Sequence, residues 1–217
     1  MTEKAKRMKN LFEILHNKKP FMEKFFDEYC FNKAGVDKNK FVDNKKDFLK
    51  FISFCLNTRQ RVVNRDLENA KLYFKDKHTL INKLIKKGDV KKLEEIIYNA
   101  PGVGQKIGSM MLEFIFMYSG YKSDKYLKEI NLPIDTHVKR VLEESFKNTK
   151  VPNINASYKS KKYVDFQKEI QGFTKNDLGR AYFDYLWFIG KVFCKKDYKL
   201  CNICWIKEVC MQKKWNL

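Results

Sequence analysis

Hydrophobic residues recur along most of the chain at the spacing of amphipathic helices. The clearest case is Phe48, Phe51, Ile52 and Cys55, which occupy positions i, i+3, i+4 and i+7 of one helical face. The same spacing predicts further helices around Leu11–Leu15, Phe21–Tyr29, Val62–Phe74, Leu80–Ile85, Leu93–Tyr98, Ile107–Tyr118, Val138–Phe146 and Leu178–Phe193. No segment alternates as a half-buried strand does, so the sequence predicts an all-α fold.

The breaks between these helices carry turn-forming and polar residues. The four prolines lie at predicted loops or helix starts, and the polar stretch Val151–Lys162 is predicted to be a loop. The length of 217 residues and the 44% hydrophobic content suit one domain or two small ones. No apolar run approaches the roughly 20 residues of a membrane helix. The charged N-terminus is followed by no apolar segment, so we expect a cytoplasmic protein.

The charge balance suggests the kind of partner. Lys and Arg number 45 against 26 Asp and Glu, which gives a formal net charge of +19. Such a balance fits a polyanion, and nucleic acid is the commonest one. Nearly all of the positive charge is lysine, so an excess that only keeps the protein soluble is an equally simple interpretation.

The segment Leu93–Leu112 predicts two helices joined by a tight turn, PGVG at residues 101–104. The glycines of the turn let backbone amides approach a ligand closely. Those amides and the positive end of the following helix would bind an anion, which on DNA is a backbone phosphate. Val103 is placed to fill the space between the helices, and Gly108 lets them cross closely. An ordinary helical hairpin shares the turn, but the full pattern favours the functional interpretation.

Two further residues are candidates for chemistry. Lys106 begins the second helix of the hairpin, and Asp135 precedes another predicted helix. An aspartate at that position is often only a helix N-cap, but a cap carboxylate is also rigidly placed, so both interpretations can hold. A lysine nucleophile must lose its proton, and a nearby carboxylate can accept it or stabilise developing positive charge.

The cysteines suggest a metal centre. Cys30 and Cys55 lie among apolar residues and are predicted to be buried thiols, whereas the other four follow the pattern C-x6-C-x2-C-x5-C over Cys194–Cys210. Four thiolates in one short loop bind zinc or an iron–sulfur cluster. Structural zinc usually shows two C-x2-C pairs and this loop has one, so a 4Fe–4S cluster is favoured over zinc. The lysines of this loop either meet phosphates or balance the charge of the cluster; they are Lys195, Lys196, Lys199 and Lys207.

Taken together in this order, the three elements resemble the helix-hairpin-helix–GPD superfamily of DNA glycosylases, in its endonuclease III branch. PGVGQK at 101–106 is similar to the family hairpin with its catalytic lysine. LPIDTHVKRV at 132–141 is similar to the segment that bears the essential aspartate. The cysteine spacing is that of the family's 4Fe–4S cluster. The resemblance is good over 93–210 and weaker over 42–75.

The resemblance implies two helical domains that flank a DNA-binding cleft. Residues 42–130 would form a six-helix barrel-like domain with the hairpin, and residues 1–41 with 131–217 a discontinuous domain that carries the cluster. The implied partner is double-stranded DNA containing a damaged base. We expect a monomer in the cytoplasm, associated with the nucleoid. The implied cluster ligands are Cys194, Cys201, Cys204 and Cys210.

The resemblance also implies roles for single residues. Lys106 would attack C1′ of a flipped nucleotide, and Asp135 would stabilise the positive charge that develops there. The hairpin residues that would contact the DNA are Gly102, Val103, Gly104 and Gln105. Flipping costs a few kcal/mol, which a wedge side chain helps to offset. Arg59 or Gln60 is the candidate wedge, although an ordinary basic loop between helices fits them equally well.

The implied activity is that of a bifunctional DNA N-glycosylase and AP lyase of base-excision repair, acting on an oxidised base through a lysine Schiff base. Two alternatives stay open: a monofunctional mismatch or alkyl-base glycosylase, and a non-catalytic iron–sulfur protein that binds DNA. The chain departs from the family in two respects that concern the substrate. The stretch from Asn64 to Pro101 is shorter than usual and lacks the Gly-x-Tyr-x-x-Lys-Ala element before the hairpin. The 28 residues between Lys106 and Asp135 exceed the usual spacing, so the extra segment around Tyr118–Asn131 would line the base pocket as a longer loop or helix.

Overall fold

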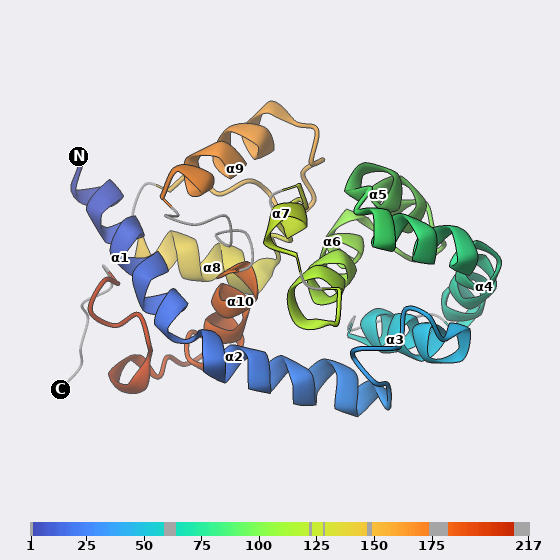
Figure 1. The fold of residues 1–217 in the computed structure, drawn as a ribbon. Coiled ribbons are helices and arrows are strands. Elements are labelled where there is room, and N and C mark those ends of the chain that lie inside the picture. The colour runs from blue at the N-terminus through green and yellow to red at the C-terminus, as the bar shows by residue number, and fades with distance from the viewer. Residues whose placement is uncertain are drawn as a thin grey trace. The chain divides into compact units, whose positions relative to one another are not determined.

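The computed structural model describes residues 2–210 apart from 59–63, 122, 128, 147–148 and 174–181. Every regular element in these ranges is a helix, and an isolated bridge joins Cys194 to Lys199. The prediction of an all-α fold is therefore confirmed. The chain divides into two compact units, which we call the continuous unit (Phe21–Pro133) and the discontinuous unit (Met1–Pro20 with Ile134–Leu217). Figure 1 shows the helices along the chain, coloured from blue to red.

The continuous unit contains most of α2 and the elements up to α7. Their bounds are α2 Lys19–Phe26, the π-helix η1 Asp27–Asn32, α3 Lys45–Asn57, α4 Asn64–Lys87, α5 Val90–Tyr98, α6 Gln105–Glu113, the π-helix η2 Phe114–Tyr118 and α7 Asp124–Leu127. Helix α3 packs against α4, α6 and η1, and α5 packs against both α4 and α6. The hairpin of α5 and α6 therefore rests on a helical core rather than projecting alone.

Aromatic rings assign the segment after Pro20 to the continuous unit. Phe26 stacks on Tyr118 with 4.8 Å between ring centroids, and Phe31 stacks on Phe51 at 5.9 Å. Phe26 and Phe31 are almost completely buried, so each contributes strongly to this core. The division of the structure thus lies at residues 20–21 and 133–134, whereas the sequence-based boundaries were placed at 41–42 and 130–131.

The discontinuous unit is built from helices of both chain ends. These are α1 Glu3–Asn17, α8 Thr136–Ser145, α9 Lys161–Phe173 and α10 Tyr182–Val192, followed by the short 3-10 helix η4 Cys201–Ile203. Helix α10 packs mainly against α8, and α1 packs against α9 and α10. Gly190 permits a close approach of α8 and α10, since a Cβ added there would lie 2.7 Å from the carbonyl oxygen of His137. The loop after α10 carries the four clustered cysteines.

Helix α4 is one continuous helix where the sequence pattern predicted two segments. Its buried residues are Ala70, Phe74, His78, Ile81, Leu84 and Ile85. His78 continues the apolar face at the position where the pattern seemed to break. Its Nε2 lies 2.9 Å from the carbonyl oxygen of Val42, so a polar ring is satisfied while it fills the core.

In the part of the chain that the structure describes, no helix combines the length and the hydropathy needed to cross a membrane.

Candidate active site and cysteine cluster

The turn between α5 and α6 has the geometry that its glycines allow. Gly102 adopts φ +70°, in the left-handed region that favours glycine. Val103 is buried, with 4% of its surface exposed, and its amide donates to the carbonyl of Ala100 at 3.0 Å. Gly104 is the N-cap of α6 and provides no side chain to cap it, and space around its Cα is open. The start of α6 therefore has a backbone surface on which an anion can approach closely.

Lys106 lies in the first turn of α6 and is exposed, while Gln105 beside it is partly exposed. The opposite face of the helix is buried, through Ile107, Gly108 and Met111. The amine therefore lies at the rim of the hairpin, next to the turn that would contact a phosphate.

Asp135 is the N-cap of α8. Its Oδ1 accepts hydrogen bonds from the amides of His137 and Val138, both at 2.8 Å, and the side chain is half-buried. The cap orients the carboxylate rigidly. Lys106 belongs to the continuous unit and Asp135 to the discontinuous one. The candidate wedge residues Arg59 and Gln60 lie outside the described residues.

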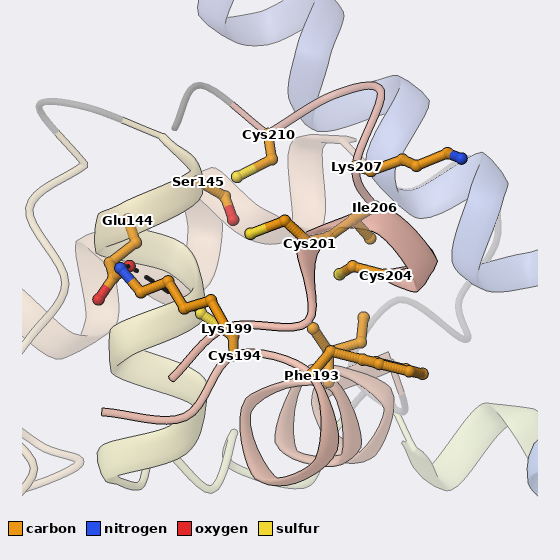
Figure 2. Close-up of a pocket in the computed structure, with 11 residues that line it drawn as sticks. Glu144, Ser145, Phe193, Cys194, Lys199, Cys201, Cys204, Ile206, Lys207 and Cys210 are labelled. Carbon is orange, nitrogen blue, oxygen red and sulfur yellow. Dashed lines mark hydrogen bonds and ion pairs between the residues drawn. The ribbon is translucent and has the colours of Figure 1, made fainter. Parts of the chain in front are cut away.

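The four cysteines of the C-terminal loop line one small pocket of about 30 Å³. Figure 2 shows their side chains around this space, together with Glu144 and Ser145 of α8. The pocket also has apolar walls from Ile189, Phe193 and Ile206. All four cysteines are free thiols and partly buried. The structure thus brings together side chains that the spacing had grouped only along the sequence.

The sulfur atoms influence one another electrostatically. Burial raises the pKa of the Cys204 thiol to about 11, and the neighbouring Cys210, Cys194 and Cys201 add to that increase. Burial also raises the pKa of Cys194, where Glu144 acts in the same direction. A bound cationic centre would reverse this, because it stabilises thiolates directly.

The cysteine donor set fits a thiolate-bound centre in composition and shelter. Four sulfurs from one loop face a pocket with apolar walls, which is the setting in which thiolates bind soft metal ions. Within the described ranges, however, no group of three or more Cys, His, Asp or Glu side chains is arranged to hold a single metal ion. A single ion needs all of its sulfurs at about 2.3 Å, whereas a cluster distributes them over several metal atoms.

Arg140 links the helix that carries Asp135 to the cysteine loop. Its Nε donates to the carbonyl of Cys194 at 2.7 Å, and its Nη2 donates to the carbonyl of Gly190 at 2.8 Å. The same Nη2 lies 2.9 Å from His137 Nδ1, which must be the acceptor because a guanidinium only donates. One side chain of α8 thus fixes both the end of α10 and the first cysteine.

A second link joins the same helix to the loop. Lys199 forms an ion pair with Glu144, drawn as a dashed line in Figure 2. The hydrogen bond that Lys199 donates to Glu144 in this pair raises the pKa of the Lys199 ammonium. Arg140 and Glu144 are one helical turn apart, so both lie on the face of α8 that meets the loop.

The sequence interpretation did not identify Arg140 or Glu144 as parts of this site. Polar residues on one face of an amphipathic helix usually face water, so their spacing gave no signal. The available hint was positional, because both follow Asp135 within one short helix.

The extra segment before Asp135 is docked on the continuous unit. The amide of Gly120 donates to the carbonyl of Lys38 at 3.1 Å, and the amide of Ser123 donates to that of Phe116 at 2.8 Å. Tyr121 donates its hydroxyl proton to Asp43 at 2.5 Å. The segment includes the short helix α7, which packs against η2. It is therefore an integral part of this unit.

Comparisons with known proteins give no identification. No family model, no curated protein and no solved structure matches this chain.

Proposed function

We propose that this protein is a DNA N-glycosylase with AP lyase activity that removes a damaged base. The observation that carries the proposal is the hairpin of α5 and α6. It combines a left-handed Gly102, an open N-cap at Gly104 and an exposed lysine in the first turn of α6. The particular activity is proposed because the three motifs, in the same order, resemble those of DNA glycosylases.

The hairpin would bind the DNA backbone without reading its sequence. The amides after Gly104 and the positive end of α6 attract a phosphate, and the formal net charge of +19 favours contact with a polyanion. A flipped nucleotide beside that phosphate would present its sugar to Lys106. The two-domain arrangement with a DNA-binding cleft belongs to the same proposal.

The chemistry begins when the deprotonated amine of Lys106 attacks C1′. The bond from C1′ to the base nitrogen breaks, and the base departs with that electron pair and takes up a proton. The carboxylate of Asp135 would stabilise the positive charge on the sugar, because its N-cap bonds hold it in one orientation. After base loss, C1′ carries both the lysine nitrogen and the ring oxygen O4′. The nitrogen loses a proton, and the C1′–O4′ bond breaks with its electron pair on O4′, which takes up a proton; this opens the sugar and gives the Schiff base. The Schiff base acidifies C2′, whose proton is lost as the 3′ phosphate leaves with the electrons of its bond to C3′.

The cysteine loop would hold a 4Fe–4S cluster through Cys194, Cys201, Cys204 and Cys210. When bound, that group supplies a rigid, charged cross-link between the ends of the loop. The support for it is that four free thiols line a single pocket with apolar walls. Arg140 would then hold the carbonyl of Cys194 against α8, so the loop and the Asp135 cap belong to one rigid assembly.

A borohydride trapping assay tests the proposal. The wild-type protein should form a reduced covalent adduct with a duplex that contains one abasic site, because the Schiff base is reduced to a stable amine. Lys106→Gln should lose this adduct completely. Lys91→Gln is the matched control, because Lys91 is exposed on α5 and is not assigned to the site. An adduct that Lys106→Gln forms at the wild-type rate would contradict the lysine assignment.

Product analysis separates the alternatives. A panel of duplexes with uracil, oxidised pyrimidines, 8-oxoguanine, alkylated bases and mismatches should yield base release with strand scission. Base release that leaves intact abasic sites would identify a monofunctional glycosylase. Tight DNA binding with no turnover on the whole panel would identify a non-catalytic DNA-binding protein.

A further inference from the structure

A chain of polar side chains joins α5, α6 and the end of the extra segment inside the continuous unit. Tyr98 at the end of α5 places its hydroxyl 2.7 Å from Ser109 Oγ on α6 and 3.0 Å from Glu94 Oε1. The same Glu94 oxygen accepts from the side-chain amide of Asn131 at 2.9 Å and from its backbone amide at 3.3 Å. Four residues from three parts of the chain thus share one hydrogen-bonded network.

The hydrogen-bond directions in this network follow from the available protons. Tyr98 has a single hydroxyl proton and donates it to the carboxylate of Glu94, so the contact to Ser109 requires the serine to donate. Ser109 is completely buried, which makes an unmade hydrogen bond there costly. The three donors on one Glu94 oxygen form charge-assisted bonds, which are stronger than neutral ones.

The network reaches α6, the lysine helix that carries Lys106, from its buried side. Ser109 lies three residues after Lys106 on α6. The ring of Tyr98 occupies the space beside Gly108 that a Cβ would otherwise take. Helix α6 therefore has one orientation relative to α5, since a rotation of α6 would break the bond to Ser109 and push Gly108 into the ring.

The other end of the network anchors the chain that leads to Asp135. Asn131 precedes Asp135 by four residues, and an extended chain spans at most about 3.3–3.6 Å per residue. Fixing Asn131 on α5 therefore limits how far the chain can carry Asp135. The lysine helix and residues 131–134, the tether of Asp135, are thus both fixed to the carboxylate of Glu94.

We propose that Glu94 and Tyr98 are positioning residues that set the lysine helix and the tether of Asp135 relative to each other. The inference rests on the function proposed above and adds residues that neither the hairpin motif nor the aspartate segment contains. It also gives the extra segment a role, because its last residue, Asn131, bonds to Glu94. Misplacing reacting groups by about 1 Å can cost roughly a hundredfold in rate.

The test measures trapping rate and DNA affinity separately on a duplex with one abasic site. Tyr98→Phe keeps the ring over Gly108 and removes only the hydroxyl, so at saturating enzyme it should be trapped about tenfold more slowly or worse. Its affinity for the same duplex should stay within about twofold, because the hairpin turn is untouched. A second variant, Ser109→Ala, should have the same signature. Glu95→Gln, on an exposed residue of α5, is the matched control and should behave as wild type.

Rescue distinguishes positioning from simple stability. Glu94→Gln retains one acceptor oxygen and should keep more of the trapping rate than Glu94→Ala. Trapping of Tyr98→Phe at the wild-type rate would overturn this inference alone, provided that wild type is trapped. Equal losses of rate, affinity and thermal stability in all network variants would also overturn it, since they indicate an ordinary structural contact. A wild-type protein that is never trapped would overturn the proposed function as well.

Discussion

The carboxylate of Asp135 has two roles that single substitutions can separate. It caps α8 through the amides of His137 and Val138, and the proposed chemistry gives the same group a charge-stabilising role. Asparagine caps helices as well as aspartate does but has no charge. We therefore expect Asp135→Asn to unfold at the wild-type temperature and yet release base at least about a hundredfold more slowly in single-turnover assays.

The alanine variant completes this comparison. Asp135→Ala removes both the cap and the charge, so it should also lose about 1 kcal/mol of unfolding free energy in denaturant titrations. An Asp135→Asn protein that releases base as fast as wild type would leave Asp135 with only the capping role.

Asp43 is a second residue with a measurable contribution, here to the pH dependence of stability. Hydrogen bonds from Lys86, Tyr121 and Asn82 hold the pKa of its carboxyl well below the usual range. A carboxyl whose pKa is lower in the folded state stabilises the protein above its unfolded pKa of about 3.9, and this contribution disappears as pH falls through the folded value.

Asp43→Asn should therefore lower the unfolding free energy at pH 7 by about 1 kcal/mol or less, because the group is half exposed and screened by solvent. Below about pH 4 the difference between variant and wild type should shrink. Urea titrations at pH 7 and pH 3 measure both values. A difference that is equal at the two pH values would contradict the electrostatic origin.

At the scale of elements, the crossing of α8 and α10 depends on one glycine. A Cβ at Gly190 would lie 2.7 Å from the carbonyl oxygen and 2.8 Å from the Cβ of His137. Gly190→Ala should therefore push the helices apart and cost about 1–3 kcal/mol of unfolding free energy, measured by denaturant titration.

Gly172 provides the matched control for this prediction. It lies within α9, where a Cβ would meet nothing within 4 Å. Gly172→Ala should stabilise the protein by about 0.5–1 kcal/mol, because alanine has the higher helix propensity. If both variants have the same stability, the close crossing at Gly190 has no energetic importance.

The sequence predicted the helices whose buried faces are purely apolar. The prediction was wrong for α4, where a polar side chain completes the buried face. Helix α4 was divided because His78 interrupts the apolar pattern, although the ring is buried and bonded to Val42. Helix α9 was not predicted for a different reason, because its buried face has only three apolar residues, Tyr163, Phe166 and Ile170. Local spacing cannot reveal a hydrogen-bond partner that lies 36 residues away in the chain.

In the candidate site, too, the sequence predicted what local spacing can show and missed the distant hydrogen-bond partners. The cysteine spacing predicted that the four thiols belong together, and the structure places them around one pocket. Residues that act through long-range hydrogen bonds were not predicted: Arg140 contacts Cys194 across 54 positions, and Glu94 contacts Asn131 across 37. Their residue types are common on helix surfaces, so only the three-dimensional arrangement distinguishes them.

At the scale of the whole molecule, the formal net charge of +19 predicts steeply salt-dependent binding to undamaged duplex DNA. Each neutralised phosphate contributes about −0.9 to the slope of log K against log salt concentration. Fluorescence anisotropy between 50 and 200 mM salt should give a slope of several units. Lys196→Gln, an exposed lysine of the cysteine loop, should reduce that slope by about one unit if this loop contacts a phosphate.

Lys77→Gln distinguishes that contact from a general effect of charge. Lys77 is exposed on α4, and its substitution changes the net charge by the same single unit. A contact in the cysteine loop predicts a smaller slope for Lys196→Gln and an unchanged slope for Lys77→Gln, because counterion release depends on phosphates that are actually neutralised. Equal reductions in both variants would mean that the lysines act only through the overall field. In that case the lysines of the loop would serve to balance the charge of its thiolates.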